Sequence, residues 1–290
     1  MKTLLVFGLA VLAVFRAAAQ VDVQLSLDQN DFLPSESVPL TVKIINHSGQ
    51  QLHLGAEANW LTFNVEAADG FVVIKNAEVP VTGAFDLDTS QLAIKRVDLQ
   101  PYFDLTKPGR YKVTATLRIK AWSAEIASAP KAFDVITGAK LWAQDFGVPA
   151  GTNHAPTVRK YTLEEANYLN SQLRLYVQVS DDSEVVVYKV SALGAMVSFG
   201  HPAAQVDRQC RLNVLWQTGA QLFTYAIVNP DGSVASMDYY EDFNSRPRLA
   251  VDNNGDVVVR GGVRRPKPTD MPVVLSPNEL PPMTPAPATK

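Results

Sequence analysis

Alternation between apolar and polar side chains constrains this chain more than any other feature of its sequence. In residues 111–119 every second residue is apolar, and the residues between them are Lys, Thr or Arg. Shorter runs with the same period lie at 23–27 and 38–44. A period of two buries one face of a strand and leaves the other in water, as in antiparallel sheets. Several such strands, separated by turn signals such as Asp69-Gly70, predict an all-β fold with a β-sandwich over residues 20–137.

Two stretches of this first half carry a family resemblance. LDQNDFLPSESVPLTVKIINHSGQQLHLG (27–55) and TKPGRYKVTATLRI (106–119) resemble the exported immunoglobulin-like modules of bacteria, of the macroglobulin and intracellular-proteinase-inhibitor types. The resemblance implies an immunoglobulin-like sandwich. It also implies a structural role for Tyr111, which would close the sandwich near its penultimate strand.

The N-terminus has the pattern of a secretory signal peptide. A positively charged N-terminal segment is followed by the apolar residues 4–15 and by the small-residue cleavage pattern Ala17-Ala18-Ala19. We therefore expect residues 1–19 to be removed and the mature protein, beginning at Gln20, to be periplasmic or extracellular; an uncleaved anchor is the alternative. No later run is long enough for a membrane span. Cleavage removes two basic residues and no acid, so the net charge moves from −3 to −5, which does not favour nucleic acid as a partner.

The second half, residues 138–265, contains a spacing that recurs. Val206-Asp207 and Val251-Asp252 are each followed, five residues past the aspartate, by an apolar-x-apolar strand start, and the offset is 45 residues. A looser match with an offset of about 37 to 39 relates residues 173–194 to 212–232. Such a period, with three or four strands per unit, is typical of propeller blades. RPRLAVDNNGDVVV (246–259) also resembles the repeats of sialidase-like β-propellers.

A closed propeller needs at least four blades, and only about two units fit here. We therefore expect a blade-like antiparallel meander; the alternative is that similar hairpins arose independently. The capping-box spacing of Thr162 and Glu165 predicts one short helix at 163–171, and the Gly-, Pro- and Asn-rich residues 145–158 predict a loop. Asn254-Gly255 predicts a two-residue hairpin with positive φ at both positions, and residues 229–232 predict a type I turn followed by a left-handed glycine.

The last strand of the predicted meander, in residues 256–262, needs a neighbour because an exposed edge invites pairing with other chains. We expect residues 140–144 to supply it, with Trp142 buried against the sheet. Beyond Arg265 the composition changes, and eight of the 19 prolines fall in residues 266–290. This composition predicts an extended or disordered tail.

The sequence contains no motif of catalysis or of metal or cofactor binding. The histidines have no HxH or HExxH spacing, and no GxSxG, P-loop or dinucleotide-binding pattern occurs. DNNGD (252–256) lacks the glycine and the acid that complete an EF-hand loop, so it is interpreted as a hairpin turn. Cys210, the only cysteine, shares strand parity with Leu212 and is expected to be a small buried residue. The arginines of a sialidase site cannot be mapped onto Arg246, Arg248, Arg264 and Arg265.

Aromatic side chains are the remaining candidates for a ligand site, because sugar-binding modules stack rings on pyranose faces. Tyr239, Tyr240 and Phe243 are so close in sequence that at least one ring must point outward from a strand. They form a candidate ligand platform, with ordinary packing and edge cover as the alternative.

Together these features favour a noncatalytic exported protein that serves as an envelope or extracellular interaction or structural module, with a protein or a glycan as partner. A carbohydrate-binding module is the first alternative and a proteinase inhibitor is the second, the latter resting on the family resemblance alone. Enzymatic activity is a further alternative, since active-site residues that are scattered over a sheet leave no local motif in the sequence.

Overall fold

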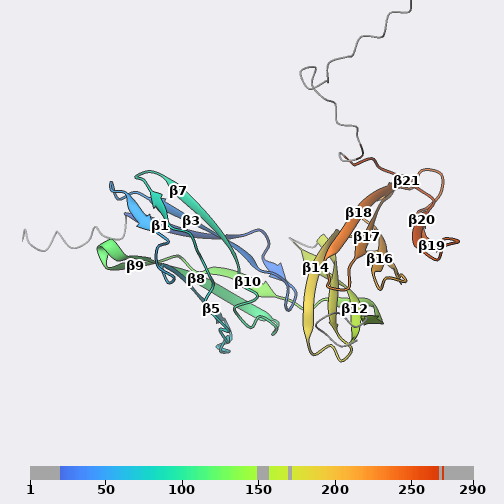
Figure 1. Cartoon of the computed structure of the whole chain (residues 1–290), viewed down its shortest axis with the longest axis horizontal. Coiled ribbons are helices and arrows are strands. Elements are labelled where there is room, and N and C mark those ends of the chain that lie inside the picture. The colour runs from blue at the N-terminus through green and yellow to red at the C-terminus, as the bar shows by residue number, and fades with distance from the viewer. Residues whose placement is uncertain (1–19, 149–156, 169–171, 268–269, 271–290) are drawn as a thin grey trace, which may run out of the picture.

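The protein is nearly all β in the computed structural model, which describes residues 20–148, 157–168, 172–267 and 270. The one helical element of these residues is a 3₁₀ turn, η2 (Lys120–Trp122). The predicted signal peptide (1–19) and most of the predicted tail (266–290) lie outside the described residues. Figure 1 shows two groups of sheets placed end to end, the N-terminal group in blue and green and the C-terminal group in yellow and red.

Two sheets enclose the N-terminal core. The first has the order β1 (Val21–Leu27), β3 (Pro39–Asn46), β7 (Leu92–Asp98). The second has the order β2 (Asp31–Phe32), β10 (Lys131–Val135), β8 (Gly109–Ile119), β5 (Leu61–Ala67), with β9 (Ala124–Ala127) also paired to β8. A short pair, β4 (Leu52–Leu54) with β6 (Phe85–Leu87), completes this half.

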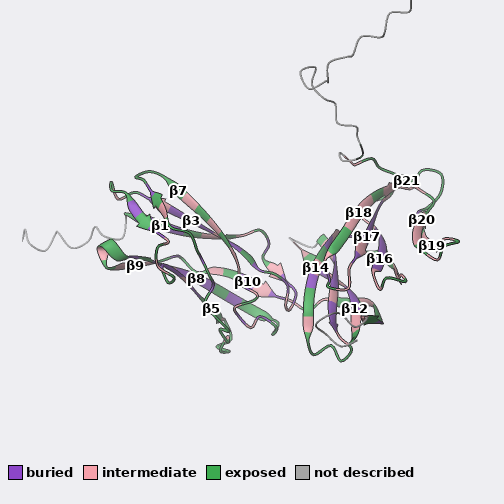
Figure 2. Cartoon of the chain, in the orientation of Figure 1, coloured by how far each residue is buried: buried purple, intermediate pink, exposed green. Residues whose placement is uncertain are grey.

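The alternation in the sequence becomes the two faces of these strands. Along β8 the apolar residues are buried in one core with residues of β5 from the same sheet and of β1 and β3 from the other, whereas their neighbours along β8 are exposed or half-buried (Figure 2). Tyr111 lies in this core, and its ring stacks on Phe133 with centroids 5.6 Å apart. The Tyr111 hydroxyl donates a hydrogen bond to the Lys107 carbonyl oxygen at 2.5 Å, so the side chain ties the start of β8 to the preceding turn.

The C-terminal half consists of two larger sheets and one hairpin. The first sheet has the order β11 (Ala139–Val148), β12 (Thr157–Tyr168), β13 (Gln172–Asp181), β14 (Val187–Ala195). The second has the order β15 (Ala203–Val206), β16 (Leu212–Gln217), β17 (Leu222–Val228), β18 (Val234–Glu241), β21 (Val263–Arg264). The hairpin is β19 (Arg248–Val251) with β20 (Val257–Arg260).

The first sheet is a meander of consecutive antiparallel strands, as is the second from β15 to β18, and β21 joins β18 after the β19–β20 hairpin. The inner faces of the two sheets share one core. Leu163 and Val177 come to this core from the first sheet, and Val214 and Trp216 come from the second. The hairpin covers the other face of the second sheet, where Leu249 and Val259 pack on Phe223 and Tyr225.

The helix predicted at 163–171 is wrong for the part that the structure describes, since residues 163–168 belong to β12, and 169–171 lie outside the described residues. Thr162 and Glu165 have the spacing of a capping box, but β12 is paired on both sides, with β11 and with β13. Backbone hydrogen bonds to two neighbouring strands outweigh the local preference. The loop predicted at 145–158 is wrong at its ends for the same reason, because β11 extends to Val148 and β12 begins at Thr157; residues 149–156 are not described.

The expected neighbour of the last strand is also wrong. Residues 140–144 belong to β11, which pairs with β12 at an edge of the first sheet. β20 pairs with β19 instead, and the hairpin buries its apolar face on the second sheet. Trp142 is half-buried and packs against the core of this half from the edge.

Candidate functional site

The three residues of the predicted ligand platform do not share a face. In β18, Tyr239 lies opposite Thr224 and Tyr240 opposite Phe223, so their side chains point to opposite sides of the sheet. Tyr240 packs under the β19–β20 hairpin, whereas the Tyr239 and Phe243 side chains are 47% and 79% exposed. Any platform in this region would therefore be formed by Tyr239 and Phe243 without Tyr240.

Three turns of the C-terminal half have the same backbone hydrogen bonds. In the turn 207–211 the Asp207 amide donates to the Arg211 carbonyl oxygen at 2.9 Å, and the Cys210 amide donates to the Asp207 carbonyl oxygen at 3.0 Å. The turns 229–233 and 252–256 repeat both bonds. The fourth residue of each turn has a positive φ: 60° at Cys210, 83° at Gly232 and 82° at Gly255.

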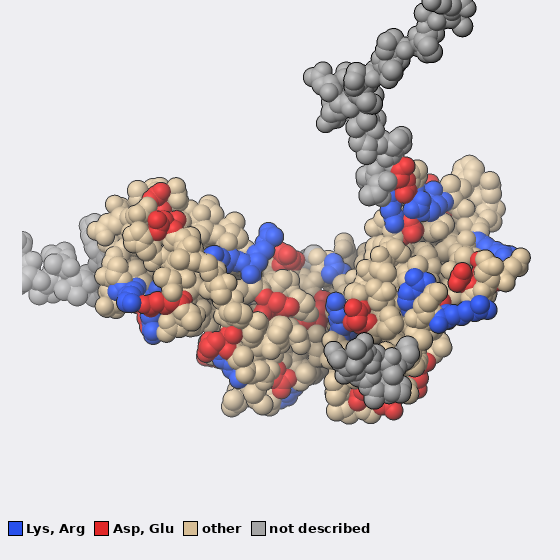
Figure 3. All heavy atoms as spheres, viewed as in Figure 1, with Lys and Arg blue, Asp and Glu red and all other residues tan. Residues whose placement is uncertain are grey.

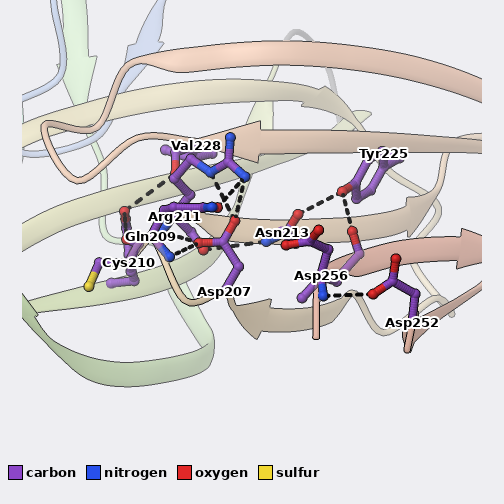
Figure 4. Close-up of polar contacts among 11 residues, drawn as sticks. Asp207, Gln209, Cys210, Arg211, Asn213, Tyr225, Val228, Asp252 and Asp256 are labelled. Atoms are coloured by element: carbon purple, nitrogen blue, oxygen red, sulfur yellow. Dashed lines mark hydrogen bonds and ion pairs between the residues drawn. The ribbon is translucent and has the colours of Figure 1, made fainter. Parts of the chain in front are cut away.

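These turns account for the 45-residue offset in the sequence and settle three local predictions. The matched aspartates, Asp207 and Asp252, each accept two backbone amide hydrogen bonds at 2.9 Å inside their own turn (Figure 4). The glycine turn at 229–232 is confirmed. The two-residue hairpin at 254–255 is wrong, since φ is positive at Gly255 alone. The strand position expected for Cys210 is wrong as well, because Cys210 lies in the turn and is only partly buried.

The turns 207–211 and 252–256 lie side by side. The Arg208 guanidinium donates to the Asn254 carbonyl oxygen at 2.7 Å and covers Gly255, where a Cβ atom would lie 2.2 Å from the guanidinium nitrogen Nη2. The Asp207 carboxylate, 3% exposed, forms an ion pair with Arg211 at 2.9 Å. The carboxylates of Asp207 and Asp252 therefore stabilise the turns through these contacts.

Two buried tyrosines connect this cluster to the rest of the half. The Tyr161 hydroxyl reaches from β12 and donates to the Cys210 carbonyl oxygen at 3.0 Å, which links the two sheets. The Tyr225 hydroxyl lies 2.6 Å from Asn213 Oδ1 (Figure 4). Burial raises the pKa of Tyr225 to about 12 and also raises the pKa of Tyr161. Both hydroxyls therefore stay protonated at neutral pH and act as hydrogen-bond donors.

An arginine-lined cavity of about 530 Å³ opens beside the hairpin, and we call it the arginine pocket. The loop between β18 and β19 and the turn after β20 form its wall. The Gly262 amide donates to the Ser245 carbonyl oxygen at 2.7 Å, which fixes these two segments together. The residues that line the pocket are Ser245, Arg246, Pro247, Arg248 and Gly261.

A second polar cluster lies where the two halves meet, and we call it the junction. Leu33 of the N-terminal half is 3% exposed and packs with Tyr176 and Val190 of the C-terminal half. Glu36 is bridged to Val190, and Gln29 accepts a hydrogen bond from Arg174 at 3.0 Å. The two halves are thus joined by apolar and polar contacts together.

Glu36 is the buried acid of the junction. Its carboxylate accepts hydrogen bonds from the Leu33 amide at 2.7 Å and from Gln29 Nε2 at 3.0 Å. Burial raises the pKa of Glu36, and these two hydrogen bonds oppose the rise. The group is thus an internal anchor for the turn 33–36, which carries Leu33 to the other half.

A further cavity, of about 310 Å³, lies in the N-terminal half near η2. Lys120 and Glu57 form an ion pair at 2.5 Å on its rim, and the wall includes Trp60. Trp60 is 2% exposed and donates from Nε1 to the Val81 carbonyl oxygen, so its ring belongs to the core and offers little surface for stacking.

The described parts of the chain lack two kinds of feature. In residues 20–148, 157–168, 172–267 and 270, no three His, Cys, Asp or Glu side chains come together in a way that could hold a metal ion. Within the same ranges no helix combines the length and the apolar character that a membrane crossing requires.

Comparison with known proteins adds one distant structural neighbour. No family model matches the chain, and no curated protein of similar sequence is found. The crystal structure of Spo0M, a sporulation control protein from Bacillus subtilis, aligns with 58% of this chain and 83% of its own at 11% sequence identity, with a TM-score of 0.31. A likeness of this size indicates neither a common fold nor a common function.

Proposed function

We propose that this protein is an exported, noncatalytic module that holds two binding surfaces at a fixed separation in the bacterial envelope or outside the cell. In this proposal the N-terminal half is an immunoglobulin-like sandwich and the C-terminal half is a pair of blade-like meanders. The signal-peptide pattern at residues 1–19 supports export.

The junction is the observation that carries the proposal. Leu33, Tyr176 and Val190 are each at most 6% exposed, so the contact between the halves excludes water as a core does. The bridge between Glu36 and Val190 adds strand-like pairing across it. Relative motion of domains is the default when their interface is small and polar. A packed junction with a buried apolar centre opposes such motion, which suits a protein whose task is to space and orient its partners.

The proposal is tested in intact cells of a bacterium that makes the protein. We expect fractionation to place the mature chain, with Gln20 as its first residue, in the periplasm or the medium. We expect cross-linking to give a discrete higher-mass complex. Leu33→Asp puts a charge into the junction and is expected to abolish the complex, while Leu92→Asp, at a side chain that is already 52% exposed, preserves it. A cytoplasmic chain with residues 1–19 retained, or a complex that survives Leu33→Asp, would contradict the proposal.

Carbohydrate binding is the second candidate, and the exposed rings of Tyr239 and Phe243 favour it. Aromatic rings that stay exposed offer a face for a pyranose ring. Phe243→Ala should abolish any signal on a glycan array, and Phe199→Ala, which removes an equally exposed ring (76% against 79%), is the matched control. Equal losses of the array signal in both variants would indicate nonspecific binding by exposed rings and would reject a sugar site.

A further inference from the structure

The C-terminal half places three arginines together without acidic partners. Arg248 and Arg260 are direct cross-strand partners in the β19–β20 hairpin, and Arg246 precedes β19 by two residues. Among the residues that the structure describes, none of the three has a carboxylate within 4.0 Å. From this arrangement we propose that the arginine pocket binds an anionic ligand through carboxylate or phosphate groups.

The arrangement is unfavourable for the protein alone. Cross-strand partners point to the same face of a hairpin, and like charges placed directly opposite each other are destabilising. Leu249 and Val259 face the second sheet, so Arg248 and Arg260 face away from it. Figure 3 shows basic side chains at the end of the molecule that carries β19 and β20. A bound anion would remove this repulsion.

Two neighbouring arginines of the same half have acidic partners. Arg264 forms ion pairs with Asp238 and Asp270, and Arg265 forms one with Glu241. Acidic side chains are thus placed against the neighbouring arginines on β21 and just after it, but not against Arg246 and Arg248 of the pocket lining or Arg260 across the hairpin. The charges of Arg264 and Arg265 are thus already neutralised within the protein, whereas those of Arg246 and Arg248 remain available to a ligand.

Arg246 is held in place before any ligand arrives. Its guanidinium carbon lies 5.2 Å from the centroid of the Phe223 ring, and Nη2 lies 3.4 Å from Gln217 Oε1. Because these contacts use only part of the guanidinium, other N–H donors remain for a ligand. A side chain whose position is fixed loses less conformational entropy on binding.

The backbone of the pocket also depends on two glycines. Gly261 and Gly262 have φ values of 79° and 65°. A Cβ atom on Gly261 would lie 2.7 Å from the Arg246 carbonyl oxygen, and one on Gly262 would lie 2.5 Å from Pro247 Cγ. Residues with side chains would push the turn after β20 away from the arginine loop. Glycine is thus required at both positions for the pocket to have this wall.

Guanidinium groups favour ligands that accept two parallel hydrogen bonds, which carboxylate and phosphate oxygens do. The proposal does not depend on the function proposed above, because a small anion could bind here whether or not the protein forms a complex. Tetragalacturonate supplies carboxylates on a saccharide, and pyrophosphate supplies phosphate groups alone. These two probes separate the two sources of negative charge.

The test is isothermal titration of the mature full-length protein with each probe at low ionic strength, with neutral maltotetraose as the control ligand. We expect one of the two anions to bind, and we expect Arg246→Gln/Arg248→Gln to weaken binding at least about tenfold, since two charge-assisted donors are lost. Arg265→Gln removes one charge from the same half without touching the pocket. It should change the affinity less than twofold, as should Arg118→Gln in β8.

A thermal measurement confirms that the variants fold. Without anion, Arg248→Gln should melt at or above the wild-type temperature, because it relieves the repulsion from Arg260. Binding of tetragalacturonate indicates a carboxylate ligand, and binding of pyrophosphate indicates a phosphate ligand. Failure of both anions to bind, or an equal loss in Arg265→Gln and in the double variant, would overturn the proposal.

Discussion

At the scale of single residues, Cys210 shows how one turn geometry tolerates different side chains at a cost. It occupies the left-handed position that Gly232 and Gly255 fill in the two equivalent turns. A residue with a Cβ atom is disfavoured there by roughly 1–2 kcal/mol. The carbonyl oxygen of Cys210 accepts the hydrogen bond from Tyr161, so the turn must keep this shape for the two sheets to be linked.

This position leads to a prediction about stability. Cys210→Gly and Cys210→Ala both remove the thiol, and only the first removes the Cβ atom. We expect the Gly variant to be more stable than the Ala variant by about 1 kcal/mol, measured by urea unfolding. Equal stabilities, or a more stable Ala variant, would mean that the left-handed backbone costs nothing at this site.

Glu36 gives a prediction about pH. Burial raises its pKa in the folded protein above the ordinary value of 4.5, so the folded state holds this proton more tightly than the unfolded state does. Its contribution to stability is therefore greatest at low pH and falls as the pH rises from 4.5 through the folded-state pKa. Glu36→Gln should remove this fall, which is measured as the slope of the unfolding free energy against pH.

The control for this measurement is Glu164, another acid whose pKa is raised by burial. In the Glu164→Gln variant, the contribution of Glu36 to the slope of the unfolding free energy against pH should be unchanged. Carboxylates with lowered pKa values, such as Asp181 and Asp231, lose their stabilising effect only at pH values below the range in which Glu36 titrates. If Glu36→Gln has the wild-type slope, the Glu36 carboxyl is not the group that titrates.

At the scale of elements, the position of a strand within its sheet decides how much its aromatic residue contributes. Trp216 lies in β16, between β15 and β17, is 2% exposed, and donates from Nε1 to the Ala195 carbonyl oxygen at 3.0 Å. Trp142 lies in β11 at the edge of the other sheet and is half-buried. The sequence predicted that Trp142 is buried beside the last strand, but it lies at the edge of the first sheet and is only half-buried.

We therefore expect Trp216→Ala to destabilise the protein by about 3–5 kcal/mol, the range for a fully buried large aromatic residue. Trp142→Ala should cost less, because part of its side chain is already in contact with water. Denaturant midpoints of the two variants at constant m-value test this order. A larger loss for Trp142→Ala would indicate that β11 contributes more to the core than its exposure implies.

At the scale of the whole molecule, the linker between β10 and β11 has to pass through a narrow space. A Cβ atom on Gly138 would lie 2.7 Å from the Glu164 carboxylate and 3.2 Å from the Leu33 side chain. The boundary predicted near residue 137 thus falls where the chain lies against both halves. Because Leu33 packs in the junction, a larger side chain in the linker would displace Leu33 and disturb the contact that orients the halves.

Gly138→Val should loosen the junction, and Gly147→Val is its control because no atom lies within 4 Å of a Cβ atom there. We expect the Gly138 variant to show a larger radius of gyration in small-angle X-ray scattering. We also expect its calorimetric unfolding to split into two transitions, since the halves no longer stabilise each other. Unchanged scattering and a single transition would show that the linker does not control the junction.

The sequence alone determined the strand character of the chain and several of its turns. Alternation in β8 predicts which residues face the core, and glycine at 232 predicts a left-handed turn residue, because both depend on neighbours within a few positions. The 45-residue offset likewise found two copies of one turn. Arg246 and Arg248 were visible in the sequence, but Arg260 is twelve residues from Arg248 and no local signal pairs them.

Only the tertiary structure decided which strands became neighbours. β12 is a strand despite its capping-box spacing because β11 and β13 pair with it on both sides. Tyr239 and Tyr240 separate because the register of β17 against β18 fixes which face each side chain takes. Arg248 meets Arg260, and Leu33 meets Tyr176, through contacts between residues far apart along the chain. These contacts depend on which strand pairing buries the most apolar surface over the whole molecule. A local sequence pattern does not specify that pairing.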